Sequence, residues 1–154
     1  METTRHFVAT VYVVHEGATA LHFHDRLEQW LPPGGHVERD ELPHVTAKRE
    51  VNEELGLAVD LQTDPQQFET STVESLPQAE HLLLEDINVD SDGRVGHQHI
   101  DFVYFGQVAN REINPGANEQ PAADWRWMRA DDLDRLDLEP DVMSIARQAI
   151  EAMS

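Results

Sequence analysis

The 154-residue chain contains no cysteine, which excludes disulfide bonds, thiolate metal sites and catalysis by a thiol nucleophile. It also lacks any apolar run close to the roughly 20 residues that a membrane-spanning helix needs. The first residues, METTRHF, lead directly into an apolar strand pattern and lack the profile of a signal peptide. We therefore expect a cytoplasmic protein without a membrane partner.

Positive charge is scarce, with 11 basic against 30 acidic residues, a formal net charge of -19, and Lys48 as the single lysine. Such a surface repels the phosphate backbone of nucleic acids, so we expect no nucleic acid polymer as a partner. A small nucleotide can still bind, because bound cations reverse the local field. Dense carboxylates with almost no lysine are typical of proteins from salt-adapted microbes, and we interpret the chain as halophilic.

A chain of this length is one ordinary domain with enough residues for a core, so we expect residues 1–154 to form a single domain. A regular apolar face over the helix predicted from Pro140 must pack on its own sheet or on a partner subunit, which leaves a homodimer open. Asp92-Gly93 predicts a turn within 88–96. Apolar and β-branched runs predict strands at 6–15, 20–24, 57–61, 68–73, 80–86, 99–109 and 124–128.

The most informative segment runs from Gly35 to Leu57. In it Glu50, Glu53 and Glu54 lie three and four positions apart, which places their carboxylates on one face of a helix. Like charges so crowded repel each other, and an ordinary surface helix gains nothing from them. A hard divalent cation among them would explain the pattern, because Mg²⁺ takes oxygen ligands and shares them with substrate phosphates.

The surrounding residues predict the helix that carries these carboxylates. Pro43 suits a first helical turn, where its missing N–H needs no partner, and Gly56 suits a left-handed C-terminal cap. Arg49 lies next to Glu50 and four residues before Glu53, so it can hold both by charge-assisted hydrogen bonds. The predicted buried stripe consists of Ala47, Val51 and Leu55.

The segment resembles the Nudix signature: a Gly, five residues, Glu, seven residues, Arg-Glu, an aliphatic, any residue, Glu-Glu, any residue, Gly and an aliphatic. No constrained position departs from it, which makes the signal highly specific. The preceding 30–34 also looks like the usual lead-in, and we expect 32–35 to form a rigid turn with close backbone approach. The resemblance implies an α/β fold, an α/β/α sandwich around a mixed β-sheet. The matching residues are Gly35, Glu41, Arg49, Glu50, Val51, Glu53, Glu54, Gly56 and Leu57.

The resemblance also implies hydrolysis of a nucleoside diphosphate linked to another moiety, by a water that Mg²⁺, or Mn²⁺ in its place, activates. Glu50 or Glu53 would take the proton from this water and Arg49 would orient them. Glu41 would be structural, favoured near the helix start by the helix dipole. Glu119, on the loop before the last strand, would approach the metals or act as the base. The implied metal ligands are the carbonyl of Gly34 and the carboxylates of Glu50, Glu53 and Glu54.

Two alternatives within the same family stay open. An isoprenoid diphosphate isomerase is disfavoured by the short chain and the absent cysteine, and a non-catalytic nucleotide sensor is disfavoured by the complete set of box carboxylates. The features expected downstream of the box for dinucleoside polyphosphates, ADP-ribose or coenzyme A are missing. A general nucleotide or other diphosphate substrate remains, with nucleoside triphosphates and their oxidised forms as candidates.

Histidines offer a second metal hypothesis. His97, His99 and Asp101 alternate along one predicted strand and so share a face. Together with His22 and His24 they would suit a transition metal, whereas a polar strand face without any metal is the simpler interpretation.

The acidic composition predicts that stability depends on salt. At 1 M KCl the Debye length is about 3 Å, so repulsion among the carboxylates is largely screened. Thermal unfolding should therefore shift to higher temperature by several degrees between dilute buffer and molar KCl. An unfolding temperature that is already maximal without salt would count against the halophilic interpretation.

Overall fold

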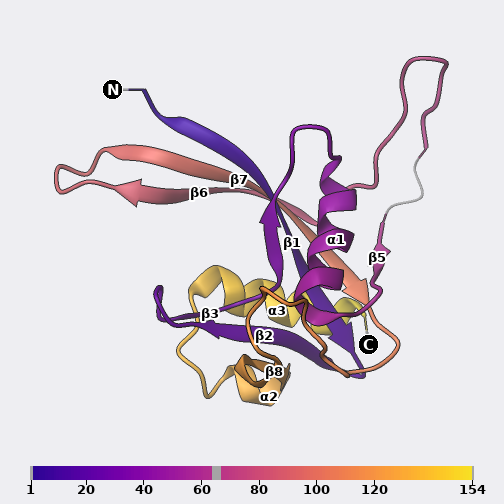
Figure 1. Ribbon diagram of the computed structural model, residues 1–154, viewed down its shortest axis with the longest axis vertical. Coiled ribbons are helices and arrows are strands. Elements are labelled where there is room, and N and C mark those ends of the chain that lie inside the picture. The colour runs from indigo at the N-terminus through magenta and orange to yellow at the C-terminus, as the bar shows by residue number, and fades with distance from the viewer. Residues whose placement is uncertain (1, 64–66, 154) are drawn as a thin grey trace.

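The computed structural model describes residues 2–63 and 67–153, which form a mixed eight-stranded sheet covered by helices (Figure 1). In chain order the elements are β1 (Thr4–His15), β2 (Ala18–His24), β3 (Gln29–Leu31), β4 (Gly34–His36), α1 (Pro43–Leu55), β5 (Asp60–Gln62), β6 (His81–Val89), β7 (Val95–Gln107), η1 (Ala122–Asp124), β8 (Trp125–Arg129), α2 (Ala130–Leu133) and α3 (Pro140–Ala152). No helix in the described ranges has the length and apolar character to cross a membrane. The predicted α/β class is confirmed.

The centre of the sheet is the long parallel pair of β1 and β7. The main strand order is β3-β2-β1-β7-β5, while β4 pairs with β1, β6 with β7 and β8 with β2. These other pairings are antiparallel. Because β4 joins β1 directly ahead of α1, the sheet fixes the start of the segment that carries the carboxylates.

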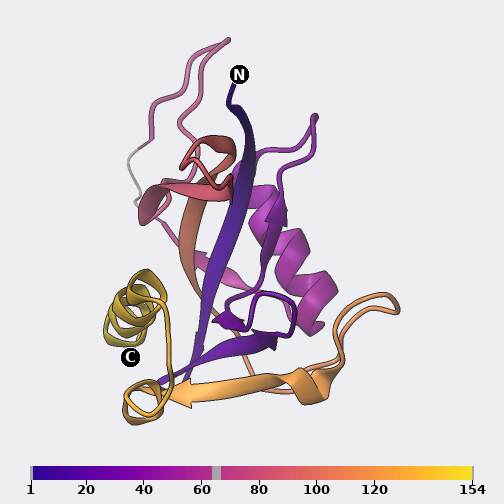
Figure 2. The ribbon, with the colours of Figure 1, turned by 90° about the vertical axis from the view of Figure 1, so that its left-hand side faces the viewer.

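Alternation along β1 builds one core on each face of the sheet. Val11 and Val13 pack in the cluster that contains the predicted stripe of α1, and all three stripe residues are fully buried. Tyr12 and Val14 pack on the opposite face with the apolar side of α3. Figure 2 shows α1 and α3 on opposite sides of the sheet, as in the expected sandwich. The apolar face of α3 is thus buried on its own sheet.

Several predicted elements differ from the structure. The strand predicted at 68–73 is wrong, since this exposed segment has only an isolated bridge between Glu69 and Glu74. The rigid turn predicted at 32–35 is wrong in its second half, because Gly34 and Gly35 belong to β4. A Cβ on Gly34 would lie 2.6 Å from the carbonyl oxygen of Ala9, so the glycine allows two backbones to approach closely. The hairpin turn of β6 and β7 is shorter than predicted, and β3 was not predicted.

Gly56 ends α1 as predicted, with a φ of 70° and its N–H bonded to the carbonyl of Asn52. Here a Cβ would also collide with the carbonyl group of Asn114. Gly93, at a φ of 81°, has open space around it. A comparison of substitutions at these two glycines therefore separates the cost of backbone strain from the cost of steric overlap.

Gly56→Ala should destabilise the protein more than Gly93→Ala. Both carry the left-handed penalty of about 1–2 kcal/mol, but only the change at Gly56 must also displace the chain at Asn114. Denaturant midpoints at matched KCl measure the difference. Equal losses in the two variants would mean that the contact with Asn114 carries no energetic weight.

Candidate active site

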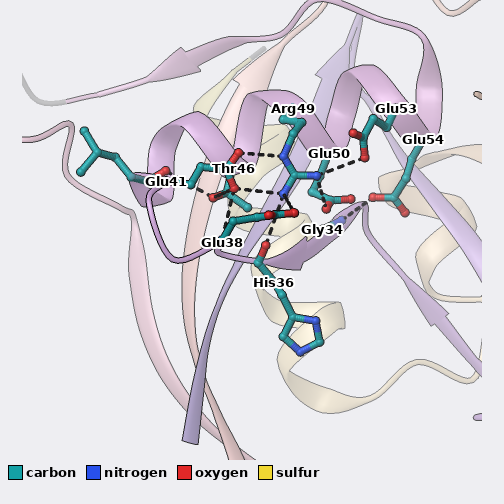
Figure 3. A network of polar contacts seen from close by, with 10 residues as sticks. Gly34, His36, Glu38, Glu41, Thr46, Arg49, Glu50, Glu53 and Glu54 are labelled. Carbon is teal, nitrogen blue, oxygen red and sulfur yellow. Dashed lines mark hydrogen bonds and ion pairs between the residues drawn. The ribbon is translucent and has the colours of Figure 1, made fainter.

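Arg49 is the centre of the polar network on α1 (Figure 3). Its guanidinium group donates hydrogen bonds to carboxylate oxygens of Glu41 at 2.7 Å, Glu50 at 2.9 Å and Glu53 at 3.1 Å. The same group donates to the backbone carbonyl of His36 at 3.3 Å, which ties α1 to the end of β4. A planar guanidinium is suited to such multiple contacts. Arg49 therefore holds two of the three carboxylates predicted to bind metal.

Glu41 fixes Arg49 in place. It accepts two hydrogen bonds from the guanidinium, at 2.7 and 3.0 Å, and a third from the hydroxyl of Thr46 at 2.6 Å. The bond from Arg49 is the main reason why the pKa of Glu41 falls to about 2. Glu41 precedes the N-cap residue Leu42 and lies outside the first helical turn. Its structural role therefore runs mainly through Arg49, while its stabilisation by the helix dipole stays a prediction.

Glu54 points to the other side of the cluster, where its carboxylate accepts a hydrogen bond from the backbone N–H of Gly34 at 2.9 Å. Burial raises the pKa of Glu54 to about 9, and the charge of Glu50 adds to the shift. Burial also raises the pKa of Glu50 despite its contact with Arg49. A side chain at Gly35 would displace the carboxylate of Glu50, so the glycine leaves room for that carboxylate in its present position.

The donor set fits a hard divalent cation. Without a cation, the half-buried carboxylates of Glu50 and Glu54 are disfavoured in their charged form, and Arg49 contacts only the first of them. A divalent ion among these oxygens would offset the unfavourable burial of charge, and carboxylates together with a backbone carbonyl are the ligands that Mg²⁺ takes. The residues that could hold such an ion are those predicted, Gly34, Glu50, Glu53 and Glu54.

Glu119 lies on a loop that is tied to the end of α1. The backbone N–H groups of Asn114 and Gly116 donate to the carbonyls of Leu55 and Glu53, each at 2.8 Å. These bonds satisfy carbonyls that the last helical turn leaves free. After burial and the charge of Glu50, the charge of Glu119 also raises the pKa of Glu54, so this loop brings Glu119 close to the cluster.

A cavity of about 380 Å³ opens beside Gly34 and Glu54, a size within the range of small-molecule sites. It extends over the β1–β7 face of the sheet toward α3. Its wall contains two carboxyl groups, those of Glu85, which sequence reasoning missed, and Asp101, which it placed on a face with His97 and His99. Asp101 is only 4% exposed and accepts a hydrogen bond from Thr10 at 3.0 Å.

Burial raises the pKa of both wall carboxyls. The pKa of Glu85 rises to about 8, and the charge of the neighbouring Asp101 adds to this shift. They meet because β6 pairs with β7, and the weak periodicity of 80–86 contained no signal for that register. His99 and Asp101 share the predicted face and both line the cavity. His22 lines it too but packs on Trp125, with ring centroids 4.5 Å apart.

Replacing Glu54 by glutamine should stabilise the metal-free protein at alkaline pH. The pKa is about 9 in the folded chain against an ordinary 4.5, so the stability contributed by the protonated group is complete below pH 4.5 and is lost as the pH rises toward 9. Glutamine has no charge to bury and keeps an oxygen for the N–H of Gly34.

In the presence of EDTA, the Tm of Glu54→Gln should match that of the wild type near pH 4.5 and exceed it increasingly up to pH 9. Each kcal/mol corresponds to about 2–4 °C for a chain of this size. The exposed Glu151→Gln on α3 is the control and should follow the wild type. Parallel profiles for the wild type and Glu54→Gln would contradict the burial of this carboxyl.

Comparisons with known proteins agree with this geometry. The family model described as the NUDIX domain matches residues 4–151. A solved NUDIX-family hydrolase from Clostridium perfringens is 28% identical, with a TM-score of 0.84 over 98% of this chain and 99% of its own. A MutT protein from Bacillus halodurans (21% identity, TM-score 0.65, 94% of this chain and 82% of that one) and a UDP-X diphosphatase (15%, 0.60, 100% and 66%) share the fold. Curated protein sequences gave no match. The chain belongs to the Nudix family and is a Nudix pyrophosphohydrolase.

Proposed function

We propose that the protein hydrolyses the pyrophosphate bond of a nucleoside diphosphate linked to another moiety, with Mg²⁺ as the cofactor and Mn²⁺ as a substitute. The observation that carries this proposal is the contact between Gly34 and Glu54, one of the three clustered α1 carboxylates, in the wall of a cavity of about 380 Å³. Diphosphate oxygens in the cavity could share a cation with those carboxylates.

When bound, the cation would supply a water of lowered pKa and would neutralise charge on the phosphates. The residues of the chain contribute positioning and proton transfer. Glu53 has the freest carboxylate of the three, with a side chain 45% exposed and one hydrogen bond to Arg49. This freedom supports Glu53 over Glu50 as the group that accepts the proton from water. Glu119, brought in by its loop, is the second candidate for this role.

For the substrate, we propose nucleoside triphosphates or their oxidised forms. The strongly acidic surface favours a small nucleotide over a nucleic acid polymer. The similar solved structures include MutT proteins and a UDP-X diphosphatase, so sugar nucleotides belong in the same comparison. A screen of phosphate and pyrophosphate release over these classes, with Mg²⁺ or Mn²⁺ in molar KCl, tests the proposal. Absence of turnover on every diphosphate while metal binds would instead favour a sensor.

Glu53→Gln should lower kcat by at least about 10²-fold, because it removes a metal ligand and a proton acceptor together. The fold should survive, since the change relieves repulsion in a crowded acidic cluster and leaves Arg49 bonded to Glu41 and Glu50. Steady-state rates and Tm are measured on the same preparations.

The matched control for this experiment is Glu151→Gln, the same substitution at an exposed position on α3. It should keep the wild-type rate. A rate for Glu53→Gln within a few-fold of the control would mean that Glu53 is neither an essential metal ligand nor the proton acceptor.

A further inference from the structure

Four histidines gather on the face of the sheet that also lines the cavity. His6 lies on β1, His36 on β4, and His97 and His99 on β7. In the parallel register His6 pairs with His99, and in the antiparallel register His36 pairs with Val8, two residues from His6. Side chains two residues apart on a strand share a face, so three adjacent strands bring these imidazoles together.

Three of these rings have ligand atoms in reach of one ion. One nitrogen from each of His6, His36 and His99 lies within 4.8 Å of the other two. The ring centroids are 5.3 Å apart for His6 and His36 and 5.2 Å apart for His36 and His99. Within residues 2–63 and 67–153, no hydrogen bond engages any of these three rings, whereas His97 bonds to the hydroxyl of Thr4 at 2.8 Å. Three nitrogen lone pairs are thus free.

We propose that His6, His36 and His99 form a binding site for a divalent transition-metal ion of the Zn²⁺ class, separate from the carboxylate site. Imidazole nitrogens suit zinc and its neighbours, whereas Mg²⁺ prefers oxygen, so ligand chemistry sorts the two ions between the two sites. Three histidines with an open fourth position are an established set of zinc ligands.

The geometry needs only a small adjustment to close around an ion. Zn–N bonds of about 2.0–2.1 Å in a tetrahedron put the nitrogens roughly 3.3 Å apart, so they must approach from their present positions. The side chains of His6 and His36 are exposed and can rotate. Burial and the neighbouring histidines lower the pKa of His99, which favours the neutral ring that a metal requires.

The site would border the active site without belonging to it. His36 and His99 line the cavity, while the imidazole of His36 points away from Arg49, which contacts only its backbone carbonyl (Figure 3). Of the histidines considered from the sequence, only His99 is one of the three proposed ligands, while His97 lies beside them and bonds to Thr4. His22 and His24 are not among these ligands.

Cobalt binding tests the proposal on the intact protein. Co²⁺ is titrated in molar KCl with excess Mg²⁺ to occupy the carboxylate site, and the visible absorption of tetrahedral Co²⁺ is recorded. The wild type should bind one equivalent, and Zn²⁺ should displace it. His6→Asn and His99→Asn should each weaken binding by at least about tenfold, because each removes one of three ligands.

His24→Asn is the matched control, since it changes another cavity-lining histidine outside the cluster and should bind Co²⁺ normally. X-ray absorption of the Zn²⁺-loaded wild type gives a second measurement that needs no variant, and it should show imidazole scattering from three ligands. Oxygen-only coordination, no Co²⁺ binding in excess Mg²⁺, or equal loss in His24→Asn would overturn the proposal. Because binding is read without substrate, this failure is distinguishable from failure of the proposed hydrolysis.

Discussion

The contact between one guanidinium group and several carboxylates is the interaction on which the site depends. In a chain with a net charge of -19, a helix that gathers three glutamates on one face is under electrostatic strain. Arg49 relieves part of this strain at Glu50 and Glu53, and it is itself fixed by the two hydrogen bonds that it donates to Glu41. Charge-assisted hydrogen bonds of this kind are stronger than neutral ones and impose direction.

Glu54 is the carboxylate that this network does not reach. It lies half-buried against the backbone of Gly34, and its raised pKa reflects the cost of placing a charge there. The folded chain therefore contains an uncompensated position for negative charge beside the cavity. A divalent cation would compensate it, and a diphosphate would share that cation.

Glycines allow close approach both in β4, the strand that precedes α1, and at the end of α1. In β4, Gly34 lets this strand lie against β1, and Gly35 leaves room for the carboxylate of Glu50. After α1, Gly56 ends the helix next to Asn114, on the loop that also carries Glu119. The three glycines thus allow contacts between segments that are far apart in sequence. A surface helix without a site would not need such contacts.

Local patterns predicted the local features of the fold well. The helix from Pro43, its buried stripe, its cap at Gly56, the long strands β1 and β7 and the helix α3 all follow from propensity and periodicity within one segment. The strand β4 was missed because proline and glycine usually break strands, whereas here the absent side chain is what lets two backbones meet.

Features that depend on strand register could not be predicted from the sequence. The carboxyl pair of Glu85 and Asp101 arises from the pairing of β6 with β7, and the group of His6, His36 and His99 from the pairing of three strands. Single-sequence patterns place residues on a face but do not align one strand against another. The site residues within α1 could be predicted because they all lie on one helix, whose geometry does not depend on strand register.

The most direct test of the carboxylate site is a crystal structure grown with Mn²⁺ and a non-hydrolysable nucleotide diphosphate analogue. Anomalous scattering should place manganese among the carboxylates of Glu50, Glu53 and Glu54, with phosphate oxygens of the analogue in the same coordination shell. Manganese absent from α1, with these carboxylates turned into bulk water while the analogue is bound, would contradict the central claim.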